Sequence, residues 1–215
     1  MKLRGNYFGP DYLDCDVRDG VLHNPAGTRI IALSEDFLLG FRKALIEETG
    51  QAHHVVFETC GRTWGENMAK RLEKELSEYY DCPLHEMPMS SFSLLLKECF
   101  LRHGWGKLEI DWELGFKQGI FEVHIVNPAF SGIFNNTENE KGLFDDDVFT
   151  GLLAAFFSRF SSKELKAYQI GYQAAPDSPR SIFVIGMDQR LKKVPDMVRS
   201  GKSSDVILNE LRSAA

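Results

Sequence analysis

Residues 107–126 have the sequence KLEIDWELGFKQGIFEVHIV, and this stretch decides the fold. In its first part Leu108, Ile110 and Trp112 alternate with acidic residues, a period of two that is typical of a half-buried β-strand. Residues 116–119 predict a turn, and residues 120–126 predict the returning partner strand. The stretch therefore predicts an antiparallel hairpin in the middle of the chain.

The segments on both sides of this hairpin also carry clear periodic signals. The tight-turn pair Asp19-Gly20 predicts an N-terminal hairpin. The remaining pattern predicts strands over 28–33, 164–174 and 181–187, helices over 34–50, 52–80, 90–103, from 143 and over 203–211, and a surface loop over 127–142. Hairpins separated by helices indicate an α+β fold in which helices pack on an antiparallel sheet built from hairpins.

Two of the predicted helices have unusual small residues. Gly61 and Gly65 lie four residues apart in helix 52–80, where each glycine lowers helix stability by up to about 1 kcal/mol relative to alanine. They predict a close approach by another backbone or by a ligand. The helix that begins near residue 143 is apolar on nearly all sides over 151–157, which predicts the most buried helix, and Asp145 to Asp147 complement its N-terminal dipole.

Composition excludes several classes of protein. Hydrophobic residues make up 43% and charged residues 26%, as in ordinary globular proteins. A net charge of −6 without a lysine and arginine cluster argues against nucleic-acid binding. The chain shows no signal peptide and no apolar run of about 18 residues. Four scattered cysteines then predict reduced thiols, so we expect a cytoplasmic protein.

Motifs for catalysis and metal binding are weak. The sequence contains no dinucleotide or P-loop motif, no nucleophile elbow and no paired-histidine zinc motif. Cys82 and His85, followed by Cys99 and His103, have spacings that resemble a zinc site. Cys99 lies among apolar residues, where a buried thiol is common, so we favour no metal. We expect no catalytic residues.

Large aromatic side chains form the strongest candidate site. The chain has 16 Phe and 3 Trp, and such side chains build either a core or the lining of an apolar pocket. Each of them alone is more simply explained as core. As a set, the candidate ligand-binding residues are Trp64, Met68, Phe92, Phe100, Trp105, Trp112, Phe121, Phe156 and Phe157.

Four segments in order resemble the 4-vinyl reductase domain family. They are FETCGRTWG at 57–65, HGWGKLEI at 103–110, FTGLLAAFF at 149–157, and SIFVI at 181–185. The resemblance covers roughly residues 50 to 188. It implies the ligand-binding fold of nitric oxide signalling and Golgi transport proteins, with residues 1–50 as an N-terminal extension packed on the same domain and residues 51–215 as the family domain.

The resemblance also implies a function. Family members bind aromatic effectors or assist tetrapyrrole metabolism, and they tend to dimerise, so it implies a homodimer. The N-terminal segment is similar to that of cyanobacterial members, which implies a role in photosystem assembly with a chlorophyll precursor or bilin as ligand. Many members carry two cysteines in the last strand pair, where this chain has Gly171, Tyr172 and Ser181.

Three hypotheses follow. The first is a non-catalytic binder of a hydrophobic small molecule, such as a non-covalently bound tetrapyrrole, that assists pigment–protein assembly. The second is a protein–protein scaffold whose core is filled by its own side chains. The third is a reductase of vinyl groups, which the sequence disfavours because no hydride-donor site is present. A pocket of roughly 300 Å3 or more, lined by the aromatic set, would distinguish the first from the second.

Overall fold

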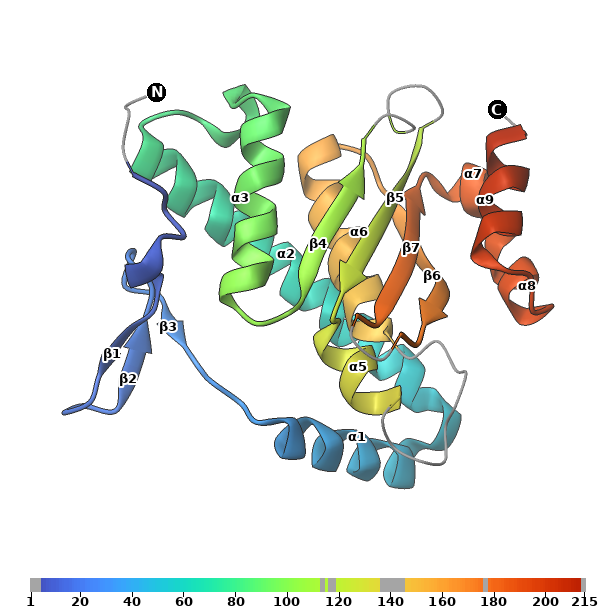
Figure 1. The fold of residues 1–215 in the computed structure, drawn as a ribbon, viewed down its shortest axis with the longest axis horizontal. Helices are drawn as coiled ribbons and strands as arrows, with labels where there is room; N and C mark the ends of the chain where they lie inside the picture. Colours follow the sequence, from blue (N-terminus) through green and yellow to red (C-terminus); the bar gives the residue numbers. More distant parts are fainter. Residues whose placement is uncertain (1–4, 113–114, 116–118, 136–145, 176–177, 214–215) are drawn as a thin grey trace.

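The computed structural model describes residues 5–112, 115, 119–135, 146–175 and 178–213. A four-stranded antiparallel sheet stands at its centre, with the strand order β4-β5-β7-β6 (Figure 1). The strands are β4 (Lys107–Asp111), β5 (Ile120–Val126), β6 (Lys166–Gln173) and β7 (Arg180–Gly186). Leu108 pairs with Ile125 in the predicted central hairpin. The predicted α+β class is therefore confirmed.

Both faces of this sheet are covered by helices. On one face Phe121, Val123 and Ile125 of β5 belong to the main core, which they share with α2 (His53–Tyr80), α3 (Met89–Arg102) and α6 (Asp147–Ser161). On the other face Ile182 and Val184 of β7 pack in a second core with α7 (Asp188–Leu191), α8 (Val194–Arg199) and α9 (Ser204–Ser213). The alternation of strand side chains produces this two-sided burial.

The crossing of α2 and α6 explains the two glycines of α2. A Cβ atom built on Gly61 would lie 2.1 Å from the Val148 carbonyl oxygen, and one on Gly65 would lie 2.4 Å from that of Leu152. From the opposite helix, a Cβ on Gly151 would lie 2.1 Å from the Glu58 carbonyl oxygen. The predicted close approach is thus confirmed, and its partner is a helix backbone. The prediction that α6 is the most buried helix also agrees with the structure, since nine of its 15 residues are buried, against ten of 28 in α2.

The N-terminal arm, which we define as residues 5–34, lies beside the body of the molecule (Figure 1). It contains η1 (Pro10–Tyr12) and a separate three-stranded sheet of β1 (Asp14–Asp16), β2 (Val21–His23) and β3 (Arg29–Ile30). An extended link then leads to α1 (Glu35–Thr49), which contacts α2 and α5 (Ala129–Asn135). Two short 3-10 helices, η2 (Gly50–Ala52) and η3 (Leu84–Glu86), precede α2 and α3.

Several predicted boundaries were wrong. Residues 129–135 form α5 and not a loop, because Phe130 and Phe134 recur at helical spacing. Phe130 packs against the main core and Phe134 is buried. Residues 136–142 lie outside the described part. Strand β4 ends at Asp111, β3 covers only two residues of the predicted 28–33, and α7 and α8 were not predicted. The predicted start at residue 143, Asp145 and the turn residues 116–118 lie outside the described residues.

Asp146 differs from its predicted role at the start of α6. It is the N-cap residue, but its side chain makes no capping hydrogen bond. Its carboxylate is fully buried and accepts hydrogen bonds from Ser131 (2.7 Å) and Ser181 (3.0 Å), while Gln169 accepts one from its backbone N–H. This buried polar cluster ties α5 and α6 to the last strand pair.

Candidate functional site

The nine predicted ligand-binding residues all belong to one aromatic core or pack against it. Met68, Phe100, Phe121, Phe156 and Phe157 are buried. The other four are half-buried and pack against the same cluster: Trp64, Phe92, Trp105 and Trp112. Most of these nine side chains therefore fill the core of the protein by packing against one another.

The rings of this core contact one another directly. Trp112 stacks on Phe121 with ring centroids 5.3 Å apart, and Phe121 meets Phe157 edge to face at 4.9 Å. Phe92 stacks near Phe156 at 6.4 Å. Such pairs are worth about 0.5–1.5 kcal/mol each beyond the area that they bury. This part of the predicted set has a packing role in the structure.

A cleft of about 1030 Å3 lies elsewhere, between the N-terminal arm and the body. Arm residues 29–33 and the start of α1 form one wall. The other wall comes from α2, the end of α3, α5 and the ends of β5 and β6. Of the nine predicted residues, Trp64 and Trp105 line the cleft and the other seven do not.

Aromatic rings form the body wall of the cleft. Trp64 and Trp105 meet edge to face with centroids 4.7 Å apart, and His103 stacks on Trp105 at 4.3 Å. Trp64 lies on α2 between the two glycines, where the crossing with α6 fixes the helix. Gly104, with a φ of 70°, ends α3 and turns the chain so that Trp105 follows directly. The wall is therefore built on rigid elements.

Positive charge gathers at this cleft although the chain as a whole is acidic. Arg29 from the arm, Arg71 from α2 and Arg102 from α3 line it, against the single carboxylate of Glu35 among the described residues. The sequence shows no basic cluster, because these arginines are 42 (71 − 29) and 31 (102 − 71) positions apart in the chain. No sequence signal could have grouped them, since only the tertiary fold brings them together.

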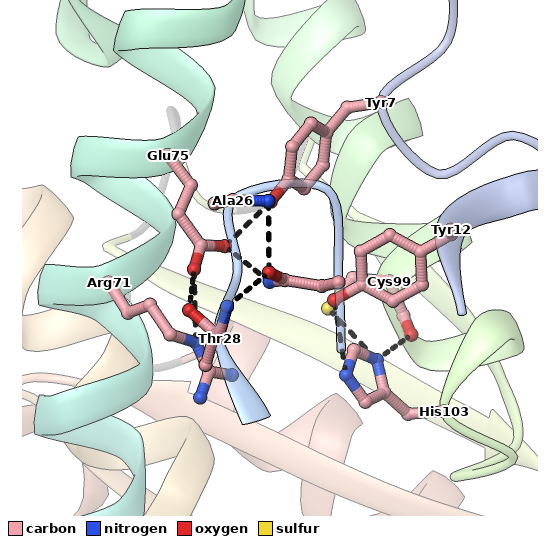
Figure 2. A network of polar contacts seen from close by, with 9 residues as sticks. Tyr7, Tyr12, Ala26, Thr28, Arg71, Glu75, Cys99 and His103 are labelled. Atoms are coloured by element: carbon pink, nitrogen blue, oxygen red, sulfur yellow. Dashed lines mark hydrogen bonds and ion pairs between the residues drawn. The ribbon is translucent and has the colours of Figure 1, made fainter. Parts of the chain in front are cut away.

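Glu75 fixes the arm next to Arg71 (Figure 2). Its carboxylate is buried and accepts hydrogen bonds from Tyr7 Oη at 2.9 Å, Asn24 Nδ2 at 3.1 Å and Thr28 Oγ1 at 2.6 Å. Arg71 forms an ion pair with it at 3.9 Å from Nε to Oε1. Burial and the Glu75 carboxylate raise the pKa of Tyr7, so this phenol stays protonated and donates.

His103 links the arm to the cleft wall. Its Nδ1 lies 2.7 Å from the Cys99 carbonyl oxygen, and its Nε2 lies 3.3 Å from Tyr12 Oη. Burial lowers the pKa of His103 and raises that of Tyr12. Both pKa shifts fit a neutral imidazole. Its Nδ1–H donates a hydrogen bond to the Cys99 carbonyl oxygen, and its Nε2 accepts a hydrogen bond from the Tyr12 hydroxyl.

Metal binding finds no geometric support in the described part of the chain. No group of three or more His, Cys, Asp or Glu side chains there could hold a metal ion. Cys99 Sγ lies 3.6 Å from His103 Nδ1, but this thiol is fully buried. Burial raises the pKa of the thiol, which opposes formation of the thiolate that a metal requires.

Membrane-spanning helices are absent from the described ranges. None of the helices there combines the length and the hydropathy that a membrane span needs.

No protein-family model matches the sequence, and no curated protein matches it. Among solved structures, the crystal structure of the phenol-responsive sensory domain of the transcription activator PoxR with phenol is similar, with a TM-score of 0.65 and 12% identity. The match covers 88% of this chain and 91% of that one.

The chain has the fold of the PoxR sensory domain. Two further solved structures are similar at lower scores. One comes from a study of heme distortion in the H-NOX family, with a TM-score of 0.46, 16% identity and coverage of 74% and 75%. The other is a trafficking protein particle complex subunit 3 from Naegleria fowleri bound covalently to palmitic acid. Its TM-score is 0.44 at 12% sequence identity, and the match covers 71% of this chain and 93% of that one. Membership of the 4-vinyl reductase family stays a prediction.

Proposed function

We propose that this protein binds a hydrophobic small molecule in the cleft between the N-terminal arm and the body, without catalysing a reaction on it. The observation that carries the proposal is the cleft itself, with Trp64 and Trp105 side by side on its wall. Its volume of about 1030 Å3 is at the upper end of the range of ligand pockets. The PoxR domain, which shares the fold, responds to phenol and was solved with it.

The finer proposal is a tetrapyrrole ligand and a role in pigment–protein assembly. It rests on the resemblance to 4-vinyl reductase domains. The size of the cleft, its aromatic wall and its arginines fit a large flat molecule with acidic side groups. The chain's own residues would hold such a molecule by stacking on Trp105 and by pairing with arginine.

Purification from a pigment-producing host tests this proposal. An absorbance spectrum with a Soret or red band, together with matching extra mass in native mass spectrometry, would support a tetrapyrrole carrier. Titration of the colourless protein with protoporphyrin IX measures the affinity directly. No bound pigment and no binding of added pigment would refute the carrier.

Two tryptophan variants distinguish the cleft from the aromatic core. Trp105→Leu should weaken binding about 3- to 10-fold, because a stacked aromatic contact is lost. Trp112→Phe is the matched control, since Trp112 packs on Phe121 and does not line the cleft. Weaker binding in the control and unchanged binding in Trp105→Leu would place the ligand in the core.

A scaffold function is the second candidate, and exposed apolar side chains favour it. Phe37 and Phe41 of α1 stack 6.4 Å apart yet are 54% and 49% exposed, and Ile31 and Val55 are 71% and 67% exposed. Exposed apolar patches often mark protein interfaces. We propose that this surface forms a homodimer, with photosystem assembly proteins as the wider partners that the resemblance implies.

Light scattering of the purified protein tests the homodimer. We expect twice the chain mass of 24.4 kDa for the wild type and the single mass for Phe37→Asp/Phe41→Asp. Val17→Asp is a suitable control, because Val17 is 85% exposed and lies in the turn between β1 and β2 of the arm. A wild-type protein that stays monomeric at high concentration would exclude the homodimer.

A further inference from the structure

Three arginines and one glutamate line the cleft, which gives it a formal charge of about +2 (3 − 1) in a chain of net charge −6. A purely apolar ligand would displace water from these guanidinium groups without offering them a hydrogen-bond acceptor, and that is unfavourable in a partly dehydrated cleft. An anionic group on the ligand would remove this penalty. The charge of the cleft therefore bears on the chemical class of the ligand.

Arg71 is the most deeply placed of these arginines. Its side chain is 30% exposed, and its Nε atom is buried without a hydrogen-bond partner among the described residues. Buried N–H groups of this kind normally have a partner, so an unmatched one requires an explanation. Arg71 also lines the same cleft as Trp64, which lies about two helical turns before it on α2.

Glu75 does not accept a hydrogen bond from the Arg71 guanidinium group. Three neutral donors, Tyr7, Asn24 and Thr28, already occupy the two oxygens of its carboxylate at 2.6–3.1 Å. The guanidinium is 3.9 Å away, which is beyond hydrogen-bond distance. Figure 2 shows this arrangement, with Glu75 directed at the arm residues and Arg71 beside Thr28. Arg71 is therefore held in place by charge while its donors remain available.

We propose that the cleft takes an aromatic carboxylic acid and that Arg71 binds its carboxylate while Trp64 and Trp105 contact its ring. This inference rests on the proposed binding function and names its ligand class. The planar fork of an arginine matches a carboxylate through two parallel hydrogen bonds.

The test compares protoporphyrin IX with its dimethyl ester, which has the same ring but no carboxylates. We expect the wild type to bind the acid about 10- to 100-fold more tightly than the ester, as measured by fluorescence titration. In Arg71→Met this preference should disappear through weaker binding of the acid. Retained binding of the ester shows that the variant is folded. Arg71→Lys, which keeps the charge without the fork, should fall between the two.

Arg159→Met is the matched control, because Arg159 is an exposed arginine that pairs with Glu73 away from the cleft. It should keep the wild-type preference for the acid. Equal affinity of the wild type for acid and ester would overturn the inference and leave the proposed binding function intact. Binding of neither molecule would overturn both. Loss of the preference in Arg159→Met as well would show a diffuse charge effect and refute the role of Arg71.

Discussion

Among single residues, Glu75 is the one on which the position of the N-terminal arm depends most. It is a buried carboxylate on α2 whose acceptors are filled by donors from three separate points of the arm: Tyr7, Asn24 and Thr28. A buried charge is tolerated only where hydrogen bonds compensate it. The network therefore determines where the arm lies, and with it the outer wall of the cleft.

Replacing this carboxylate should release the arm. Glu75→Gln leaves one oxygen to accept from the three donors, so we expect a loss of about 1.5–3 kcal/mol in the free energy of unfolding. Residues of the arm should also be cut faster in limited proteolysis. Glu73→Gln is the control, because its ion pair with Arg159 is exposed and should contribute less than about 1 kcal/mol. Equal stability of the two variants would contradict the role of Glu75.

His103 should make stability depend on pH. Burial lowers its pKa in the folded protein below the ordinary value of 6.5, so the unfolded chain binds more protons as the pH falls through 6.5. The free energy of unfolding should therefore decrease between pH 7.5 and 5. In thermal unfolding over this range, His103→Gln should show a shallower decrease. His85→Gln, at a 74% exposed side chain, should keep the wild-type slope.

Among the elements, the crossing of α2 and α6 determines the shape of the body. Three glycines, Gly61, Gly65 and Gly151, let the two helix backbones meet without intervening side chains. Trp64 projects from this fixed region to the cleft wall. The glycines therefore reduce the intrinsic stability of α2 in exchange for a defined position of the site.

Alanine at one of these glycines should be strongly unfavourable. The added Cβ in Gly61→Ala would lie 2.1 Å from the Val148 carbonyl oxygen, so we expect a destabilisation of about 1–3 kcal/mol or more in urea unfolding. Gly40→Ala on α1 is the matched control. A Cβ there meets nothing within 4 Å, so the change should stabilise the protein by about 0.4–1 kcal/mol. A neutral Gly61→Ala would contradict the close crossing.

The whole molecule joins the arm and the body in one core. Tyr7, Phe8 and Tyr12 of the arm are buried in the same cluster as Met68 and Leu72 of α2. The arm therefore contributes to the core as well as to the cleft. The division of the chain at residue 50 into an extension and a 4-vinyl-reductase-like domain stays a prediction.

Unfolding of the whole chain should therefore be one cooperative transition. Phe8→Ala, at a fully buried side chain of the arm, should lower the stability of the body by about 3–5 kcal/mol. Tryptophan fluorescence measures this, because the three tryptophans at 64, 105 and 112 all lie in the body. Val17→Ala, at an exposed side chain of the arm, should have no effect. An unchanged midpoint for Phe8→Ala would show that the arm folds separately.

Local sequence patterns predicted the fold class, the strands of the central sheet and the long helices. The alternation that begins at Leu108, the glycine pair of α2 and the apolar run of α6 each express a local rule of backbone geometry or burial, and the corresponding elements lie where they were predicted. Helix α5 was missed because glycine, proline and asparagine near it outweighed the short spacing of Phe130 and Phe134. Sequence also identified Trp64 and Trp105, but it could not separate them from aromatic core residues.

Only the tertiary structure decided where the cleft lies and what charge it carries. Whether an aromatic ring fills a core or lines a cleft depends on its neighbours in space, and these come from distant parts of the chain. Arg29 of the arm lines the same cleft as Arg71 and Arg102 because Glu75 holds the arm against α2. Local patterns contain no information about such long-range contacts, which is why an acidic sequence without a basic cluster forms a positively charged cleft.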